Sequence, residues 1–318
     1  MTNFKELVFD SENRLDENGN FKFPDCVKKI RIDVGLSNEA YHSCEWLLNN
    51  EDIAVIGVEA NPKCQQNLLL GNTANSYIHT LCLEGERICR FVGYISEVYL
   101  KKNLLNLDLT QPENQQMIPS GCIEISGFNP FIIGRALIVM GVFRMFPVFE
   151  EIKEIKDKYT LITAAADNVQ EDQIEIKSFY STPKDLGTSS LIKEVLTQFP
   201  EKGEFEEVKV NCISLDTLLN HIPWDRFEVI ECIKIDAEGK DLDILKGCKK
   251  YLHKVVFFKV EAFEITDENI CTYNKNNEII EFLEENNFKL VAKEPGDYQF
   301  INNLFLDRSP GEFNWEKK

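Results

Sequence analysis

The chain has 318 residues, and its 53 Asp and Glu residues outnumber its 35 Lys and Arg residues, which gives a formal net charge of −18. Hydrophobic residues make up 43% of the sequence, enough for a large core, so global disorder is excluded. A chain this acidic, without a dense run of Lys or Arg, repels phosphate groups. We therefore expect neither nucleic acid nor an anionic membrane surface as a partner.

Strands and helices alternate at the start of the chain. Residues 29–35 and 53–59 predict two strands, and the second is almost continuously apolar, as in strands buried on both faces of a parallel sheet. Residues 39–49 predict the helix between them, and Asn61-Pro62 begins a second helix with proline in its first turn. This β-α-β-α order predicts an open α/β sheet.

The alternation is lost in the middle of the chain and returns later. We interpret residues 81–158 as a large insertion in a domain of residues 28–318, which follows an N-terminal arm of residues 1–27. The remaining predicted elements are strands at residues 160–167, 229–236 and 255–261, helices at 241–252 and 279–286, and a closing antiparallel hairpin within 288–306.

Two features bear on location. The ten cysteines are scattered, with no CxxC pair and no Cys/His cluster at zinc spacing, and the N-terminus lacks the apolar run of a signal peptide. Reduced cysteines without a secretion signal predict a cytoplasmic protein. The apolar stretch at residues 128–149 is interrupted by Arg135 and Arg144, so we interpret it as buried structure or a hydrophobic contact surface and expect no membrane span.

Acidic residues follow the predicted strands. Asp33, Glu59, Asp236 and Glu261 stand at four strand ends, and Asp167 follows a fifth. Because ligands of open α/β sheets bind beyond the C-terminal ends of the strands, we expect these acids to line one cleft. For any single acid, an exposed loop carboxylate or a helix cap is the simpler interpretation.

The turn after the first strand indicates the kind of cofactor. Gly35 lets the backbone approach a ligand closely, and Glu59 is placed to accept both hydroxyls of a ribose. The turn has one glycine where dinucleotide sites have G-x-G-x-x-G, and Glu39 would repel a pyrophosphate. An adenosine cofactor without phosphates fits better, and the cationic sulfonium of S-adenosylmethionine tolerates nearby acids.

Three segments in order resemble the FkbM-family methyltransferases. They are residues 31–35 with 56–62, residues 178–182 with 187–191, and residues 214–218 with 233–239 and 245–247. The resemblance covers residues 31–306 apart from 81–158. It implies a Rossmann-like class I methyltransferase fold, with a mostly parallel seven-stranded sheet that ends in an antiparallel hairpin. It also implies O-methylation with S-adenosylmethionine, often of sugar or polyketide hydroxyls.

The resemblance also assigns roles within the cofactor site. It implies that Asp33 and Gly35 hold the amino-acid part of the cofactor and that Glu59 holds the ribose. Ala166 and Asp167 would lie near the adenine. Asn61, in the segment that contains Glu59, is assigned to the same site.

Candidate catalytic residues follow the strand at 229–236. By the resemblance, Asp236 and Glu238 face the transferred methyl group and the acceptor. A hydroxyl acceptor needs a general base or a metal. Asp236 or Glu238 is the candidate base, or both bind Mg²⁺ together with Glu261; the alternative is that Glu238 caps the next helix and Asp236 anchors a loop. His42 is the histidine best placed as a base, and Lys234 is interpreted as an ion-pair partner of Asp236.

The sequence therefore predicts an S-adenosylmethionine-dependent O-methyltransferase that acts on a hydroxyl of a sugar or other small hydroxylated acceptor, a small molecule or a glycan. Two other classes stay open. A non-catalytic methyltransferase-like binding protein is one, because Asn38-Glu39 stands where the family usually has a further glycine. An NAD-dependent oxidoreductase is the other, disfavoured by the missing glycines. We interpret the Phe-rich insertion as extra core or as the surface of a homodimer; the alternatives are a lid over the cleft and an element that recognises the acceptor.

Overall fold

The computed structural model describes residues 2–37, 40, 42–43, 46–47, 50–70, 157–182, 185–197, 204–262, 276–294 and 296–306. The predicted insertion at 81–158 lies outside these residues except for its last two, and so does the apolar stretch at 128–149. Among the described residues, no helix combines the length and the hydrophobicity that crossing a bilayer requires.

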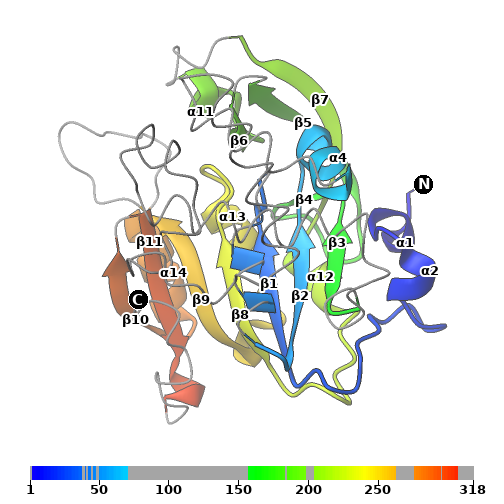
Figure 1. Ribbon diagram of the computed structural model, residues 1–318. Helices are drawn as coiled ribbons and strands as arrows, with labels where there is room; N and C mark the ends of the chain where they lie inside the picture. Colours follow the sequence, from blue (N-terminus) through cyan, green and yellow to red (C-terminus); the bar gives the residue numbers. More distant parts are fainter. Residues whose placement is uncertain are drawn as a thin grey trace, which may run out of the picture.

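A seven-stranded sheet forms the centre of the molecule (Figure 1). Its order is β10-β11-β9-β8-β1-β2-β3, in which the strands from β9 to β3 are parallel and β10 and β11 are antiparallel to their neighbours. The strands are β1 (Lys29–Val34), β2 (Ile53–Val58), β3 (Tyr159–Ile162), β8 (Ile230–Ile235), β9 (Val255–Ala262), β10 (Phe288–Glu294) and β11 (Gly296–Asn302). The mixed α/β class with a parallel-rich sheet is confirmed.

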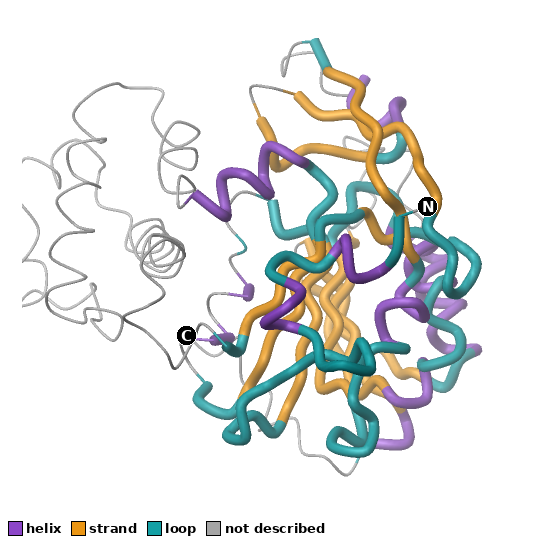
Figure 2. Tube along the Cα trace, turned by 90° about the vertical axis from the view of Figure 1, so that its right-hand side faces the viewer, coloured by secondary structure: helices purple, strands orange, loops and turns teal. Residues whose placement is uncertain are grey.

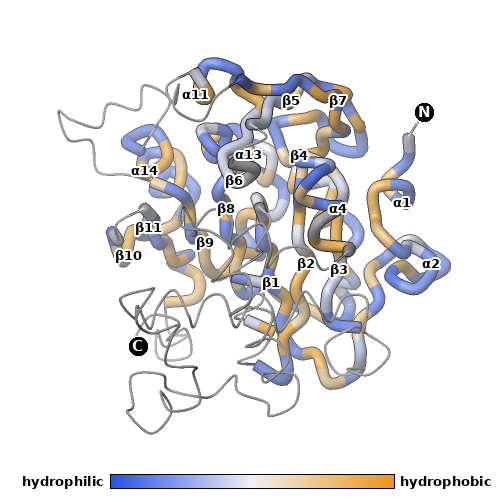
Figure 3. The backbone as a smooth tube through the Cα atoms, turned by 45° about the horizontal axis from the view of Figure 1, so that its top comes forward, coloured by the Kyte–Doolittle hydropathy of each residue, from blue (hydrophilic) through white to orange (hydrophobic). Residues whose placement is uncertain are grey.

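The central strands are apolar because both faces of the sheet are covered. Every residue of β2 and of β8 is buried, as expected for parallel strands between two layers. Side chains such as Ile56 and Ile233 join the main core with Ile32 and Phe258 from the neighbouring strands. Ile53 and Val55 belong to a second apolar cluster. Figure 3 shows hydrophobic residues along the central strands and hydrophilic residues on surface elements such as α2 (Ser11–Arg14).

A second sheet of four strands stands beyond one end of the main sheet (Figures 1 and 2). Its order is β4-β7-β5-β6, and its strands are β4 (Ala165–Ala166), β5 (Glu175–Thr182), β6 (Asp185–Ser190) and β7 (Glu206–Ile213). The single strand predicted at 160–167 is therefore wrong: β3 ends at Ile162 and β4 belongs to the second sheet. The break falls at Thr163, whose N–H donates to the Leu7 carbonyl at 2.8 Å and not to the ladder.

Helices connect the strands and cover the sheet. They are α1 (Phe4–Leu7), α2, α4 (Pro62–Leu70), α11 (Lys193–Thr197), α12 (Leu215–Leu219), α13 (Asp241–Lys246), α14 (Asn276–Glu285) and the 3-10 turns η3 (Leu252–Lys254) and η4 (Asn303–Phe305). The helix predicted at 241–252 is shorter than expected. It ends at Lys246, and Gly247 is its C-cap residue. A Cβ at Gly247 would lie 2.8 Å from the carbonyl oxygen of Asp167, so the chain packs closely there on the loop that follows β4.

The N-terminal residues pack directly on the main sheet. Val8 forms an antiparallel bridge with Ile162, and the N–H of Phe9 donates to the Leu161 carbonyl at 3.0 Å. Apolar side chains of this segment, among them Leu7 and Val8, belong to the main core. The predicted arm thus contributes core residues and one partner for β3.

Candidate active site

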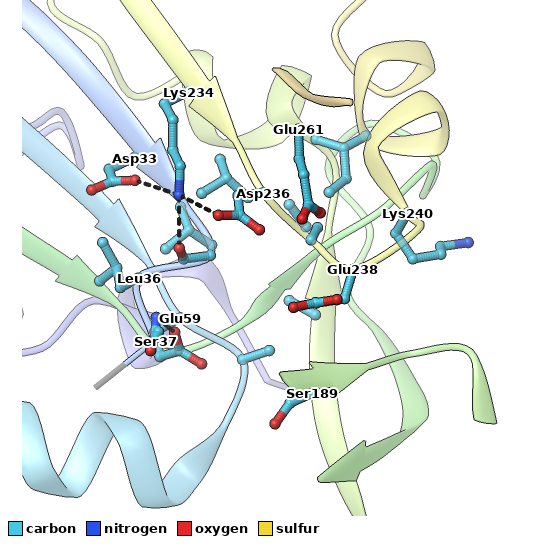
Figure 4. Close-up of a pocket in the computed structure, with 18 of the residues that line it drawn as sticks. Asp33, Leu36, Ser37, Glu59, Ser189, Lys234, Asp236, Glu238, Lys240 and Glu261 are labelled. Carbon is cyan, nitrogen blue, oxygen red and sulfur yellow. Dashed lines mark hydrogen bonds and ion pairs between the residues drawn. The ribbon is translucent and has the colours of Figure 1, made fainter. Parts of the chain in front are cut away.

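A cavity of about 280 Å³ lies at the C-terminal ends of β1, β2 and β8, with β6 of the second sheet on its far side (Figure 4). The cavity lies between strand ends of the main sheet and the second sheet. Ligands of open α/β sheets bind in this place, beyond the C-terminal ends of the strands. The predicted site residues that line it are Asp33, Gly35, His42, Glu59, Ala166, Asp236, Glu238 and Glu261. Asn61 and Asp167 are not among its lining residues.

Gly35 allows the ends of β1 and β8 to meet. Its φ is +80°, a left-handed conformation that other residues rarely adopt, and a Cβ at this position would lie 1.8 Å from the carbonyl oxygen of Asp236. Only glycine fits a contact this close. The turn after β1 therefore packs directly on the loop that carries Asp236.

Asp33, at the end of β1, anchors the segment that follows the turn. Its Oδ2 accepts hydrogen bonds from the N–H and the hydroxyl of Ser43, at 3.0 and 2.7 Å. Its Oδ1 lies 3.6 Å from Nζ of Lys234. Burial raises the pKa of Asp33, and the contacts with Lys234 and Ser43 oppose that rise. Asp33 thus lines the ligand cavity and also holds Ser43, in the segment that follows the turn.

Glu59, at the end of β2, connects two turns at the cavity edge. Oε2 accepts from the N–H of Ser37 at 2.8 Å, and Oε1 accepts from the N–H of Asn61 at 2.6 Å. Burial raises the pKa of Glu59 to about 7, although the N–H groups of Asn61, Ser37 and Leu36 act against the rise. Because each carboxylate oxygen has a second lone pair, Glu59 still has acceptor capacity toward the cavity.

Asn61 supports this corner from behind. Its Oδ1 accepts from the N–H of Lys63 at 3.0 Å, which satisfies a free donor in the first turn of α4. Its Nδ2 donates to Oγ of Ser189 on β6 at 3.1 Å. The residue therefore ties the β2 turn to the second sheet.

Asp167 has an ion-pairing position. Its two oxygens lie 2.9 Å from Nζ of Lys177 and 2.9 Å from Nζ of Lys240. Burial alone would raise the pKa of Asp167, but the two lysines outweigh it and the pKa lies below its ordinary value. The neighbouring Ala166 lines the cavity, whereas Asp167 joins the second sheet to the loop before α13. The adenine contact predicted for this pair stays a prediction.

Lys234 makes the ion pair that the sequence predicts. Its Nζ lies 3.2 Å from Oδ2 of Asp236, and it also donates to the Gly35 carbonyl at 3.2 Å. Burial lowers the pKa of Lys234, but Asp236 and Asp33 outweigh burial, so the pKa lies above its ordinary value. The side chain is therefore a buried cation among acids.

Three carboxylates converge on the other side of the cavity. One oxygen each of Asp236, Glu238 and Glu261 lies within 4.8 Å of the others, and Figure 4 shows the three side chains around a common space. Burial, followed by the charges of Asp236 and Glu238, raises the pKa of Glu261 well above its ordinary value. This spacing suits oxygen ligands around one cation or a proton held between carboxylates. The predicted Mg²⁺ stays a prediction.

Asp241, at the start of α13, was not among the predicted site residues. Its carboxylate accepts from the N–H groups of Ala237 at 3.1 Å and Gly239 at 3.3 Å, so it anchors the loop between β8 and α13. The helix cap considered for Glu238 is not formed, because the N-cap residue of α13 is Lys240 and no side chain caps the helix. Burial, and then the charge of Asp236, raises the pKa of Asp241 to about 6. Glu238 has a φ of +49°, rare for a residue with a Cβ, and its carbonyl accepts from the Ser190 hydroxyl at 2.8 Å. The sequence signal was an aspartate in a first helical turn.

His42 lines the β1 side of the same cavity, next to Ser43, which binds Asp33. Its ring centroid lies 6.0 Å from that of Trp46. The structure thus brings His42 to the cavity. Its role as a base stays a prediction.

Comparison with known protein families gives a match over residues 33–290 to the methyltransferase FkbM domain. Because this match spans more than half of the chain, the chain is a member of the FkbM methyltransferase family. The resemblance seen in three sequence segments is thereby confirmed. No protein with a curated description matches the chain.

Two solved structures are similar over most of the chain. One is methyltransferase FkbM from Methylobacillus flagellatus KT, with 10% identity and a TM-score of 0.34, covering 91% of this chain and 47% of that one. The other is the rRNA methyltransferase aviRa from Streptomyces viridochromogenes, with 10% identity and a TM-score of 0.31, covering 91% of this chain and 82% of that one. The chain spans less than half the length of the first.

Proposed function

We propose that the protein is an S-adenosylmethionine-dependent O-methyltransferase that acts, in the cytoplasm, on a hydroxyl of a sugar or another small hydroxylated acceptor. The observation that carries the proposal is the position of Glu59. This buried carboxylate ends β2 at the cavity edge and holds the turn of Ser37 and the turn of Asn61. An acid in this place is suited to the two hydroxyls of a ribose.

The charge of the cavity supports the same cofactor. Its lining includes the acids Asp33, Glu59, Asp236, Glu238 and Glu261, which outnumber the lysines Lys234 and Lys240 of the same lining. These acids favour a cationic sulfonium and disfavour the phosphates of a dinucleotide. Asp33 and Gly35 would hold the amino-acid part, Glu59 the ribose and Ala166 the adenine side. When bound, S-adenosylmethionine supplies the electrophilic methyl group.

The acceptor side is assigned to the carboxylates after β8. Lys234 engages Oδ2 of Asp236, and we assign Oδ1 of Asp236, or the carboxylate of Glu238, to the proton of the acceptor hydroxyl. Removing that proton makes the oxygen a better nucleophile, and holding it in line with the methyl group supplies the orientation that displacement at carbon needs. The same two residues with Glu261 would hold Mg²⁺ if the reaction uses it.

Calorimetric titration with S-adenosylhomocysteine, with NAD as a parallel ligand, tests the cofactor assignment. We expect the wild type to bind S-adenosylhomocysteine and not NAD. Glu59→Gln keeps the shape and loses the charge, so its affinity should be lower by about tenfold or more, the equivalent of one charged hydrogen bond. Glu206→Gln, which changes an exposed acid paired with Lys63, is the matched control and should bind like the wild type.

Two results would contradict the assignment. One is equal affinity of the wild type and Glu59→Gln for S-adenosylhomocysteine, and the other is binding of NAD. Normal S-adenosylhomocysteine binding with no methyl transfer to a panel of hydroxylated sugars would instead favour the non-catalytic binding protein.

A further inference from the structure

Lys234 lies where the two halves of the cavity meet. Its side chain is 5% exposed, and its Nζ lies 3.2 Å from Oδ2 of Asp236 and 3.6 Å from Oδ1 of Asp33. The same atom donates to the carbonyl of Gly35 at 3.2 Å, as the dashed lines in Figure 4 show. These contacts come from the end of β1, from the turn after it and from the loop after β8. One ammonium group thus joins the turn assigned to the cofactor and the loop assigned to the acceptor.

The charges around Lys234 are mainly negative. Asp33 faces it from β1, Asp236 from the loop after β8, Glu261 from the end of β9 and Asp297 from β11. A second buried cation nearby is Lys259, its register partner on β9, whose Nζ lies 3.2 Å from Asp297. Lys234 lines the cavity and Lys259 does not. Lys240, another lysine of the lining, pairs with Asp167 and Asp243 instead.

Its charge also acts on the acids that line the cavity. Burial raises the pKa of Asp33, Glu59 and Glu261, and the ammonium of Lys234 opposes the rise at each of them. Glu59 matters most for a ligand, because burial brings its pKa to about 7 and a small change in local charge alters its ionisation at neutral pH.

We propose that Lys234 is a positioning residue of the cofactor site, whose ammonium joins Asp33 and the Gly35 turn to Asp236 and compensates the negative charge of the cavity. The inference rests on the proposed function, because it takes Glu59 as the ribose acceptor. Without the ammonium, Glu59 becomes ionised only at higher pH. A protonated Glu59 has one oxygen that donates, so it no longer accepts from the turn N–H groups and from a ribose together.

The pH dependence of S-adenosylhomocysteine affinity separates this role from a general structural one. For the wild type, we expect affinity to fall as the pH drops through about 7, the pKa of Glu59. In Lys234→Met the midpoint should move to higher pH, so binding is weaker than in the wild type below the midpoint and recovers in alkali. A loss of structure would weaken binding equally at every pH.

Lys259→Met is the matched control. It removes a lysine of the same type and burial, in register with Lys234, that pairs with Asp297 and does not line the cavity. It should keep the wild-type midpoint. Lys234→Gln retains a hydrogen-bond donor and loses the charge, so it replaces Lys234→Met if that variant does not fold. Lys234→Arg keeps the positive charge and should have the wild-type midpoint.

An unchanged midpoint in a folded Lys234 variant, or an equal shift in Lys259→Met, would overturn the inference while leaving the proposed function in place. Failure of the wild type to bind S-adenosylhomocysteine at any pH would overturn the proposed function, and this inference with it. The two failures are therefore distinguishable in one titration series.

Discussion

Replacing Gly35 by alanine tests the close packing between the turns after β1 and β8. The new Cβ would lie 1.8 Å from the carbonyl oxygen of Asp236. Carbon–oxygen contacts in proteins are about 3.3–3.6 Å, so the two turns must separate by roughly 1.5 Å. The left-handed backbone costs alanine about 1–2 kcal/mol, and the forced separation of a packed contact adds about 1–3 kcal/mol. We therefore expect the free energy of unfolding to fall by about 2–5 kcal/mol.

Gly19→Ala is the control, because Gly19 shares the backbone conformation and not the crowding. Its φ is +82°, and the atom nearest to an added Cβ is Nδ1 of His221, at 3.8 Å. This variant should lose only the conformational part, about 1–2 kcal/mol. Urea unfolding followed by tryptophan fluorescence measures both losses. Equal losses in the two variants would refute the packing argument.

Two further outcomes are expected. Asp167→Asn removes the ion pairs with Lys177 and Lys240 and should lower the free energy of unfolding by about 1–3 kcal/mol at neutral pH. The two lysines outweigh burial, so the pKa of Asp167 is lower in the folded protein than in the unfolded chain. The stability that Asp167 contributes is therefore complete above its unfolded pKa and is lost as the pH falls through its folded pKa. The wild type and the variant should then have the same stability in strong acid, and a stability difference that does not depend on pH would refute this. Millimolar Mg²⁺ should raise the melting temperature of the wild type and not of Glu261→Gln, since Glu261 belongs to the carboxylate cluster. Identical responses would remove Mg²⁺ from this site.

The strands of the main sheet were predictable because burial on both faces produces continuous apolar runs in the sequence. Residues 53–58 are such a run and are buried at every position, as is typical of strands that lie between two layers. Residues 230–235 are equally buried but include Glu231 and Lys234, which form ion pairs with Arg31 and Asp236. The common position of the acids that follow these strands was predictable from strand direction, because parallel strands bring their C-terminal ends to one edge of the sheet.

The second sheet has a weaker sequence signal. The first residues of β5 and β7 are exposed or half-buried and include several charged side chains, so neither strand reads as an apolar run or as a clean alternation. The division between β3 and β4 depends on the N-terminal segment, since the carbonyl of Leu7 receives the N–H of Thr163. Contacts between segments more than a hundred residues apart have no local signal.

The partners of the candidate site residues were the least predictable part. Asp33 was expected to face a ligand, and the structure adds Ser43, which donates to it twice. Asp167 was expected near an adenine, and the structure gives it Lys177 from the second sheet and Lys240 from the loop before α13. Such pairings follow from tertiary packing, which decides whether a carboxylate is available to a ligand or engaged within the protein.

The N-terminal segment has a consequence for self-association. In the main sheet, β3 pairs with β2 on one side. On its other side, the N–H of Phe9 donates to the Leu161 carbonyl and the Leu7 carbonyl accepts from the N–H of Thr163. An open strand margin is a template for pairing with another molecule. By occupying it, the chain's own first residues block growth of the sheet into a second copy on this side. A homodimer that continued the main sheet would instead have to pair with β10, the strand at its other end.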